Sequence, residues 1–185
     1  MTLPALVPGR PLPDREILAG IRLLLLDVDG VLTDGRIHFD RDGMEYKSFH
    51  VHDAAGLAYW HRSGGRSGFL SGRGGEVVER RAKELGVHEV VLKRLDKATA
   101  FEEILARQQL TPIEVAYVGD DLLDLPVLRR VGFAVTVPEG RPDLAAAVHF
   151  VTQRAAGFGA ARCVIDKLLR ARGAWDEVVR KAGLP

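Results

Sequence analysis

The segment that most constrains the fold of this chain is a run of four leucines, Leu23–Leu26, followed at once by Asp27 and Asp29. Four consecutive large aliphatic residues predict a strand that is buried on both faces, as in the middle of a parallel sheet. Two carboxylates at the end of such a strand repel each other in a partly desolvated site unless positive charge lies beside them. The segment therefore predicts a central strand that ends in a charged site.

The composition is typical of a globular protein that works in water. The chain has 185 residues, of which 46% are hydrophobic, and its formal net charge is +1. This length predicts one domain, and the balanced charge gives no electrostatic reason to expect nucleic-acid or membrane partners. The single cysteine, Cys163, excludes an intramolecular disulfide and is typical of a reducing compartment. We expect a cytoplasmic protein.

Short strand-like segments alternate with longer helix-like segments along the chain. Strands are predicted over residues 21–28, 66–72, 87–93, 115–121, 133–137 and 149–152, and helices over residues 54–64, 75–86, 96–110, 123–132 and 160–173. Such alternation predicts an α/β fold with a Rossmann-like parallel sheet and helices on both faces. An Asp-Gly pair between two alternating runs predicts a small β-hairpin within residues 36–49. We expect an extended tail over residues 1–20, one domain over 21–172 and a C-terminal tail over 173–185.

Polar side chains follow several of the predicted strands at the edge where parallel sheets bind ligands. Asp27 and Asp29 follow the first strand, Ser71 and Asp120 follow two others, and Lys97 begins a helix after a fourth. Carboxylate oxygens with no His or Cys beside them favour Mg²⁺. A carboxylate nucleophile, a second acid, a hydroxyl group and a lysine around this metal suit phosphoryl transfer through an aspartyl-phosphate.

Four motifs in a fixed order, "DVDGVLTDG", "LSGR", Lys97 and "GDDLLD", resemble those of the haloacid dehalogenase-like phosphatases, and the resemblance runs from about residue 22 to 172. It implies a Mg²⁺-dependent hydrolase of phosphomonoesters. Transferred position by position, it implies that Asp27 is the nucleophile and Asp29 is the general acid/base. It implies that Ser71 and Lys97 bind the phosphoryl group. The metal site would consist of Asp27, the Asp29 backbone carbonyl and Asp120, with Asp124 as the supporting acid.

Two spacings leave no room for a cap domain. Only 41 residues separate Asp29 from Ser71, and 22 separate Lys97 from Asp120. The chain thus resembles the capless subfamily of 3-deoxy-D-manno-octulosonate 8-phosphate phosphatases, which implies a small sugar-phosphate substrate, a role in lipopolysaccharide biosynthesis, and a homotetramer in which the hairpin of one subunit closes a neighbour's site. The resemblance also implies substrate contacts by Thr33, Lys47, His52, Gly72 and Arg73.

Two positions depart from this subfamily, because His52 and Phe158 stand where it usually has arginine. Arginine binds carboxylates through paired hydrogen bonds that neither residue reproduces. The expected substrate is a 2-keto-3-deoxy sugar acid phosphate such as 3-deoxy-D-manno-octulosonate 8-phosphate, and another small phosphorylated metabolite is the alternative.

Two further function classes share parts of this pattern. One is an accessory subunit of the same fold, similar to the small subunit of phenylphosphate carboxylase, and the presence of every catalytic residue argues against it. The other is a receiver-like signalling switch, which also places an Asp, a hydroxyl group and a Lys around Mg²⁺. The order of its motifs differs, and a switch does not need the acid two residues beyond Asp27.

Overall fold

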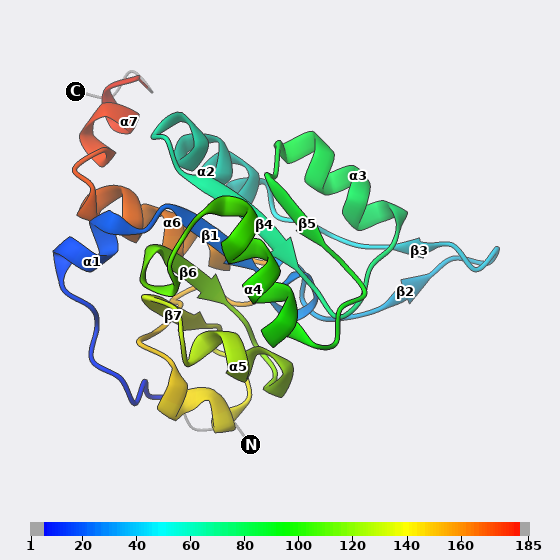
Figure 1. Cartoon of the computed structure of the whole chain (residues 1–185). Coiled ribbons are helices and arrows are strands. Elements are labelled where there is room, and N and C mark those ends of the chain that lie inside the picture. Colours follow the sequence, from blue (N-terminus) through cyan, green and yellow to red (C-terminus); the bar gives the residue numbers. More distant parts are fainter. Residues whose placement is uncertain (1–5, 182–185) are drawn as a thin grey trace.

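The predicted central strand lies in the middle of the sheet in a computed structural model, which describes residues 6–181 (Figure 1). Six parallel strands follow the order β5-β4-β1-β6-β7-β8. Their bounds are β1 (Leu23–Leu26), β4 (Arg66–Leu70), β5 (Glu89–Val91), β6 (Val115–Val118), β7 (Phe133–Thr136) and β8 (Phe150–Val151). Leu26 pairs with Phe69 of β4 and Val118 of β6, so these three strands end at the same level.

Helices cover both faces of this sheet, as the sequence predicts. They are α1 (Arg15–Gly20), α2 (Val51–Arg62), α3 (Glu76–Leu85), α4 (Lys97–Gln108), α5 (Leu125–Leu128), α6 (Ala160–Ala171) and α7 (Trp175–Lys181). Side chains alternate along a strand, so Leu24 and Leu26 pack in the core under α2, α3 and α6. Leu23 and Leu25 pack on the other face with α4 and α5. The α/β fold with a Rossmann-like parallel sheet is confirmed.

The predicted hairpin consists of two short antiparallel strands, β2 (His38–Phe39) and β3 (Glu45–Tyr46). Figure 1 shows it protruding from the body of the molecule. Its turn is held by Asp40, whose Oδ1 accepts hydrogen bonds from the backbone N–H groups of Asp42 and Met44 at 2.9 and 2.8 Å. Between β1 and β4 the described chain holds a turn, this hairpin and α2, so it has no cap domain there.

Several element boundaries differ from the predicted ones. Residues 15–20 form α1 inside the tail that was expected to be extended, and Leu18 joins the core. Residues 175–181 form α7 inside the predicted C-terminal tail, whereas the predicted helix over 123–132 is only the four residues of α5. Residues 1–5 and 182–185 of the two tails lie outside the described residues, and the domain limits stay a prediction. No helix within residues 6–181 has the length and apolar character needed to cross a membrane.

Candidate active site

The turn after β1, Val28–Leu32, carries the two carboxylates that follow the leucine run. Asp27 Oδ1 accepts a hydrogen bond from the Val28 backbone N–H at 2.7 Å. Gly30 adopts φ +89°, which side chains rarely tolerate, and a Cβ atom there would lie 2.1 Å from Asp120 Oδ2. Glycine is therefore required for the turn and for the close approach of Asp120.

Three carboxylates meet at the carboxyl end of the sheet and could hold a cation. Oxygen atoms of Asp27, Asp120 and Asp124 all lie within 4.8 Å of one another. Asp120 Oδ1 is buried and has no hydrogen-bond partner among the described residues. Burial, together with the charges of Asp27 and Asp124, raises the pKa of Asp120 to about 8. A crowded carboxylate cluster with an oxygen left unpaired fits a hard divalent cation such as Mg²⁺.

Lys97 places its ammonium group inside this cluster. The side chain is buried, and Nζ lies 2.9 Å from Asp27 Oδ2 and 2.6 Å from Asp124 Oδ1. Burial alone would lower the pKa of Lys97, but the two carboxylates outweigh it and raise the pKa. Burial raises the pKa of Asp27 to about 6, although the charge of Lys97 opposes that shift. The lysine thus stays positively charged beside the predicted nucleophile.

Asp124 is held differently from the other two acids, because it is fully buried and its oxygens accept four hydrogen bonds. Oδ1 accepts from Lys97 Nζ and from the Tyr117 hydroxyl, and Oδ2 accepts from the backbone N–H groups of Asp120 and Asp121. A carboxylate has about four acceptor positions, so all are in use. This geometry favours the predicted supporting role, with Asp27 and Asp120 offering the free acceptor capacity to a metal.

Asp29 faces the base of the hairpin rather than the carboxylate cluster. Its Oδ1 lies 2.5 Å from Lys47 Nζ, and its Oδ2 lies 3.7 Å from Arg73 Nε. The Thr33 hydroxyl donates a hydrogen bond to the same Oδ1 at 3.4 Å. Glu45 contacts both cations, at 2.8 Å from Lys47 and 3.5 Å from Arg73. The structure therefore joins three of the predicted substrate-contact residues around the predicted general acid/base.

Glu45 is a member of this network that sequence reasoning missed. Residues two apart on a strand point to the same side, so Glu45 shares the face of Lys47 in the hairpin. Burial alone would lower the pKa of Lys47, but its hydrogen bonds to Asp29 and Glu45 outweigh burial and raise it. The i, i+2 pair of opposite charges was the signal in the sequence that could have identified Glu45.

Ser71 and Gly72 follow β4 at the same edge. Ser71 is buried, and its hydroxyl oxygen accepts a hydrogen bond from the Arg73 backbone N–H at 3.3 Å. A Cβ atom on Gly72 would meet only Leu95 and Leu123, at 3.4 and 3.6 Å. The position of Ser71 beside the end of β1 agrees with the predicted contact to a phosphoryl group.

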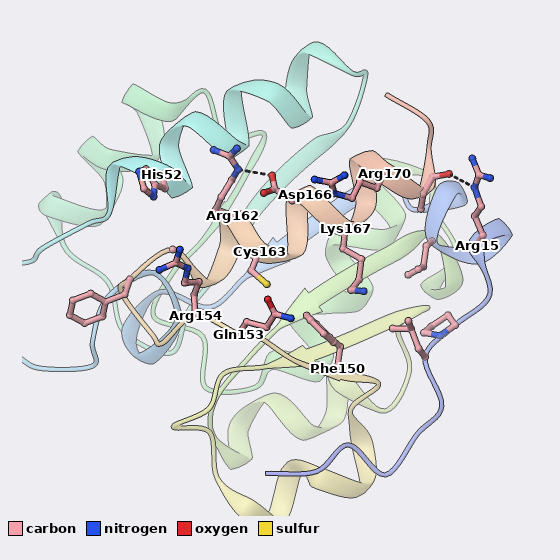
Figure 2. Close-up of a pocket in the computed structure, with 16 residues that line it drawn as sticks. Arg15, His52, Phe150, Gln153, Arg154, Arg162, Cys163, Asp166, Lys167 and Arg170 are labelled. Atoms are coloured by element: carbon pink, nitrogen blue, oxygen red, sulfur yellow. Dashed lines mark hydrogen bonds and ion pairs between the residues drawn. The ribbon is translucent and has the colours of Figure 1, made fainter. Parts of the chain in front are cut away.

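His52 lies apart from the carboxylate cluster. It is exposed in the first turn of α2, and its backbone N–H donates a hydrogen bond to His50 Nδ1 at 3.2 Å. Together with Phe158 it lines a cavity beside α6 whose lining includes none of the predicted catalytic residues (Figure 2). A contact between His52 and substrate stays a prediction.

Comparisons with known proteins agree with this geometry. Residues 73–163 match the family of haloacid dehalogenase-like hydrolases. The 3-deoxy-D-manno-octulosonate 8-phosphate phosphatase KdsC of Escherichia coli K12 is 42% identical over 157 residues, which cover 85% of this chain and 84% of that protein. Among solved structures, the 3-deoxy-D-manno-octulosonate 8-phosphate phosphatase from Moraxella catarrhalis, in complex with magnesium ion, phosphate ion and KDO, has a TM-score of 0.88 at 34% identity and covers 91% of this chain and 97% of its own.

The cobalt-bound form of the deoxy-D-mannose-octulosonate 8-phosphate phosphatase from Haemophilus influenzae has a TM-score of 0.82 at 35% identity. It covers 86% of this chain and 93% of its own. Two of these similar proteins thus hold a divalent metal, and the acidic cluster of this chain has the chemistry to do the same.

Proposed function

This chain belongs to the haloacid dehalogenase-like phosphatases, in the group of the 3-deoxy-D-manno-octulosonate 8-phosphate phosphatases, and from this membership we propose that it hydrolyses 3-deoxy-D-manno-octulosonate 8-phosphate with Mg²⁺ as cofactor. The observation that carries the proposal is the buried contact of Asp27 with Lys97 beside the unpaired oxygen of Asp120. A complete set of catalytic groups also argues against an accessory subunit without activity.

The reaction has two steps, and Asp27 and Asp29 have a different role in each. In the first, a carboxylate oxygen of Asp27 attacks phosphorus, the bond from phosphorus to the sugar oxygen breaks, and Asp29 gives that oxygen a proton. In the second, water attacks the aspartyl-phosphate and gives a proton to Asp29, which releases phosphate and restores Asp27. Lys97 and Ser71 hold the oxygens of the phosphoryl group during both steps.

Mg²⁺ would be held by Asp27, by Asp120 and by the backbone carbonyl of Asp29, with Asp124 supporting the loop. When bound, it supplies positive charge that offsets the charge of the phosphoryl oxygens. The close carboxylates of the cluster, and the pKa of Asp120 raised to about 8, support this assignment.

The first prediction concerns the nucleophile. Asp27→Asn should abolish hydrolysis of p-nitrophenyl phosphate and of the sugar acid phosphate, because an amide cannot form the aspartyl-phosphate. Asp14→Asn is the matched control, since Asp14 is exposed and its side chain makes no capping hydrogen bond to α1. Wild-type turnover by Asp27→Asn, with circular dichroism showing a folded protein, would contradict the mechanism.

The substrate is tested with a panel of phosphorylated sugars and phosphorylated sugar acids. We expect the highest kcat/KM for 3-deoxy-D-manno-octulosonate 8-phosphate. Because His52 and Phe158 replace arginines in the motif, a higher kcat/KM for a sugar phosphate without a carboxylate would assign a different small metabolite to the same chemistry.

We further propose that the protein is a cytoplasmic homotetramer in which the hairpin of one subunit closes the site of a neighbour. The hairpin carries Phe39, Met44 and Tyr46, which are 61%, 61% and 52% exposed. Leu95 and Leu123, which flank Gly72 at the sheet edge, are also exposed. Exposed apolar groups on both a protruding hairpin and the rim of a site suit contact between copies.

This assembly gives the second prediction. Phe39→Ser combined with Met44→Ser should lower the solution mass measured by light scattering, and should reduce kcat/KM for the sugar acid phosphate more than for p-nitrophenyl phosphate. The reason is that a site without its cover still binds a small activated ester, whereas the larger sugar acid phosphate loses its contacts with the cover. A fully active wild-type monomer would contradict the proposal.

A further inference from the structure

A second concave surface lies along α6. Its volume is about 1010 Å³, and it is lined by α6, by β8 with the loop that follows, and by α1 with the segment before it (Figure 2). Among the described residues, none of Asp27, Asp29, Ser71, Lys97 and Asp120 contributes to this lining. His52 and Phe158 line one end of the groove, so it adjoins a predicted substrate contact but lies apart from the carboxylate cluster.

Positive charge is concentrated in this groove. Its lining holds five cationic side chains and one carboxylate, namely Arg15, Arg154, Arg162, Lys167, Arg170 and Asp166. Arg162 Nε and Asp166 Oδ1 pair at 2.5 Å. Among the described residues, the other four cations have no carboxylate within ion-pair distance. Because the whole chain has a formal charge of only +1, this local excess is a property of the groove.

The contacts of these cations orient them without neutralising them. Lys167 Nζ lies 4.7 Å from the centre of the Phe150 ring, and the Arg170 guanidinium lies 4.2 Å from that of Trp175. Arg15 Nε donates a hydrogen bond to the Ala171 carbonyl at 3.1 Å. Figure 2 shows Lys167 between Arg154 at one end of the groove and Arg15 at the other. These cations thus come from three parts of the chain that line the groove, namely α1, α6 and the loop after β8.

The dimensions of the groove suit a ligand larger than a single ion. The face of α6 from residue 162 to residue 170 spans about 12 Å, at 1.5 Å per residue. Small-molecule pockets have volumes of roughly 300–1,000 Å³, and this groove lies at the upper end of that range. Arginine recognises phosphate and carboxylate through paired hydrogen bonds, so Arg154 and Arg170 suit an anion with separated charged groups.

We propose that this groove, defined by Arg15, Arg154, Lys167 and Arg170, is a second ligand site that binds a metabolite carrying two or more phosphate or carboxylate groups. The four residues that define the proposed site are none of the predicted catalytic or substrate-contact residues, so the proposal does not depend on the substrate of the catalytic site. It predicts that polyanions bind this protein when the catalytic centre contributes nothing to the affinity.

The experiment is isothermal titration calorimetry with inorganic tripolyphosphate in the presence of EDTA. EDTA removes any divalent metal that could bridge the anion to the carboxylates of the catalytic edge, and the α6 variants then report the binding that depends on the groove. We expect binding by the wild type and by Asp27→Asn. Lys167→Gln combined with Arg170→Gln should weaken binding by at least about tenfold, which is about 1.4 kcal/mol. The matched control is Arg80→Gln with Lys83→Gln, which removes two exposed cations from α3.

Several outcomes would overturn the proposal. These are no binding by the folded wild type, an equal loss in both double variants, or a loss in Asp27→Asn alone. Binding of a polyglutamate peptide without binding of tripolyphosphate would also overturn it, and would assign an acidic polypeptide to the groove. If the α6 double variant does not fold, Arg154→Gln alone decides the question, because Arg154 is exposed in a loop. That variant should also weaken binding.

Discussion

Asp124 is a fully buried carboxylate that accepts four hydrogen bonds, two from side chains and two from backbone N–H groups. An unpaired charge at such a depth would cost several kcal/mol, so these donors are what allows the group to stay there. The acid in turn holds Lys97 Nζ at 2.6 Å, and the same ammonium group lies 2.9 Å from Asp27. The position of Lys97, which is predicted to bind the phosphoryl group, therefore depends on the buried carboxylate of Asp124.

Tyr117 is the residue of this group whose role is tested most directly. Its hydroxyl donates to Asp124 and accepts a hydrogen bond from Lys97 Nζ at 3.1 Å. Tyr117→Phe removes both contacts and keeps the ring, so we expect Lys97 to shift toward Asp124. The kcat should fall about tenfold, which is about 1.4 kcal/mol, with a smaller change in KM. Steady-state kinetics measure this, with Tyr59→Phe as a control. An unchanged kcat would show that Tyr117 acts only in packing.

The sequence predicts Asp27, Lys97 and Asp120 because each follows a strand or begins a helix at the edge where ligands bind, and the structure brings them together. Tyr117 could not be predicted in the same way. It lies within a buried strand, where an aromatic residue is ordinarily part of the core. Its partners Asp124 and Lys97 are 7 and 20 residues away in the chain, so only the folded sheet reveals the contact.

Among the elements, the strands were more predictable than the helices at the two ends of the chain. The leucine run becomes β1 because its side chains can be buried on both faces of the sheet. The helix α1 was missed because six residues among prolines carry little helical signal of their own. Short helices gain their stability from tertiary packing, and α1 packs through Leu18 into the core shared with α6. Local sequence does not contain that information.

The edge of the sheet at β7 and β8 gives a pH-dependent prediction. His149, just before β8, accepts a hydrogen bond at Nδ1 from the Ala134 backbone N–H at 2.9 Å. Burial, and then the charge of Arg10, lowers its pKa to about 4 from an ordinary value of about 6.5. Between these two values the unfolded chain binds more protons than the folded one. This group therefore contributes stability above about pH 6.5 that is lost as the pH falls toward about 4.

His149→Gln should remove that contribution. Urea unfolding at about pH 7.5 and about pH 5 should show a larger loss of unfolding free energy in the wild type than in the variant. His52→Gln is the control, because His52 is exposed, and it should keep the wild-type difference. Equal losses in the wild type and in His149→Gln would contradict the assignment.

At the scale of the whole molecule, two regions differ in their charge. Carboxylates gather at the carboxyl edge of the sheet, and unpaired cations gather along α6, although the formal net charge is only +1. Without a metal, Lys97 and a bound proton offset the repulsion between the carboxylates at this edge, as the pKa of Asp120 near 8 indicates. The folded state therefore binds more protons than the unfolded chain between about pH 4 and pH 8, and this contribution to stability is lost as the pH rises through about 8.

Binding of Mg²⁺ should offset that loss, since the metal competes with the proton for the same oxygens. The increase in Tm on adding excess Mg²⁺ to EDTA-treated protein should be larger at about pH 8 than at about pH 5.5. Differential scanning calorimetry measures it. Asp120→Asn should show a smaller increase at the higher pH. An increase that is the same at both pH values, or is retained in full by Asp120→Asn, would contradict a metal site at Asp120.

The ion pairs at the base of the hairpin constrain how the sequence of such an enzyme can evolve. Lys47 and Glu45 belong to the arm that protrudes from the body, yet Lys47 lies against Asp29. A substitution that moves the arm therefore also changes the surroundings of Asp29, the predicted proton donor. In the proposed tetramer, one substitution in the arm would therefore alter both the contacts between copies and the rate of turnover, so selection on the chemistry would also limit sequence change at the surface of the arm.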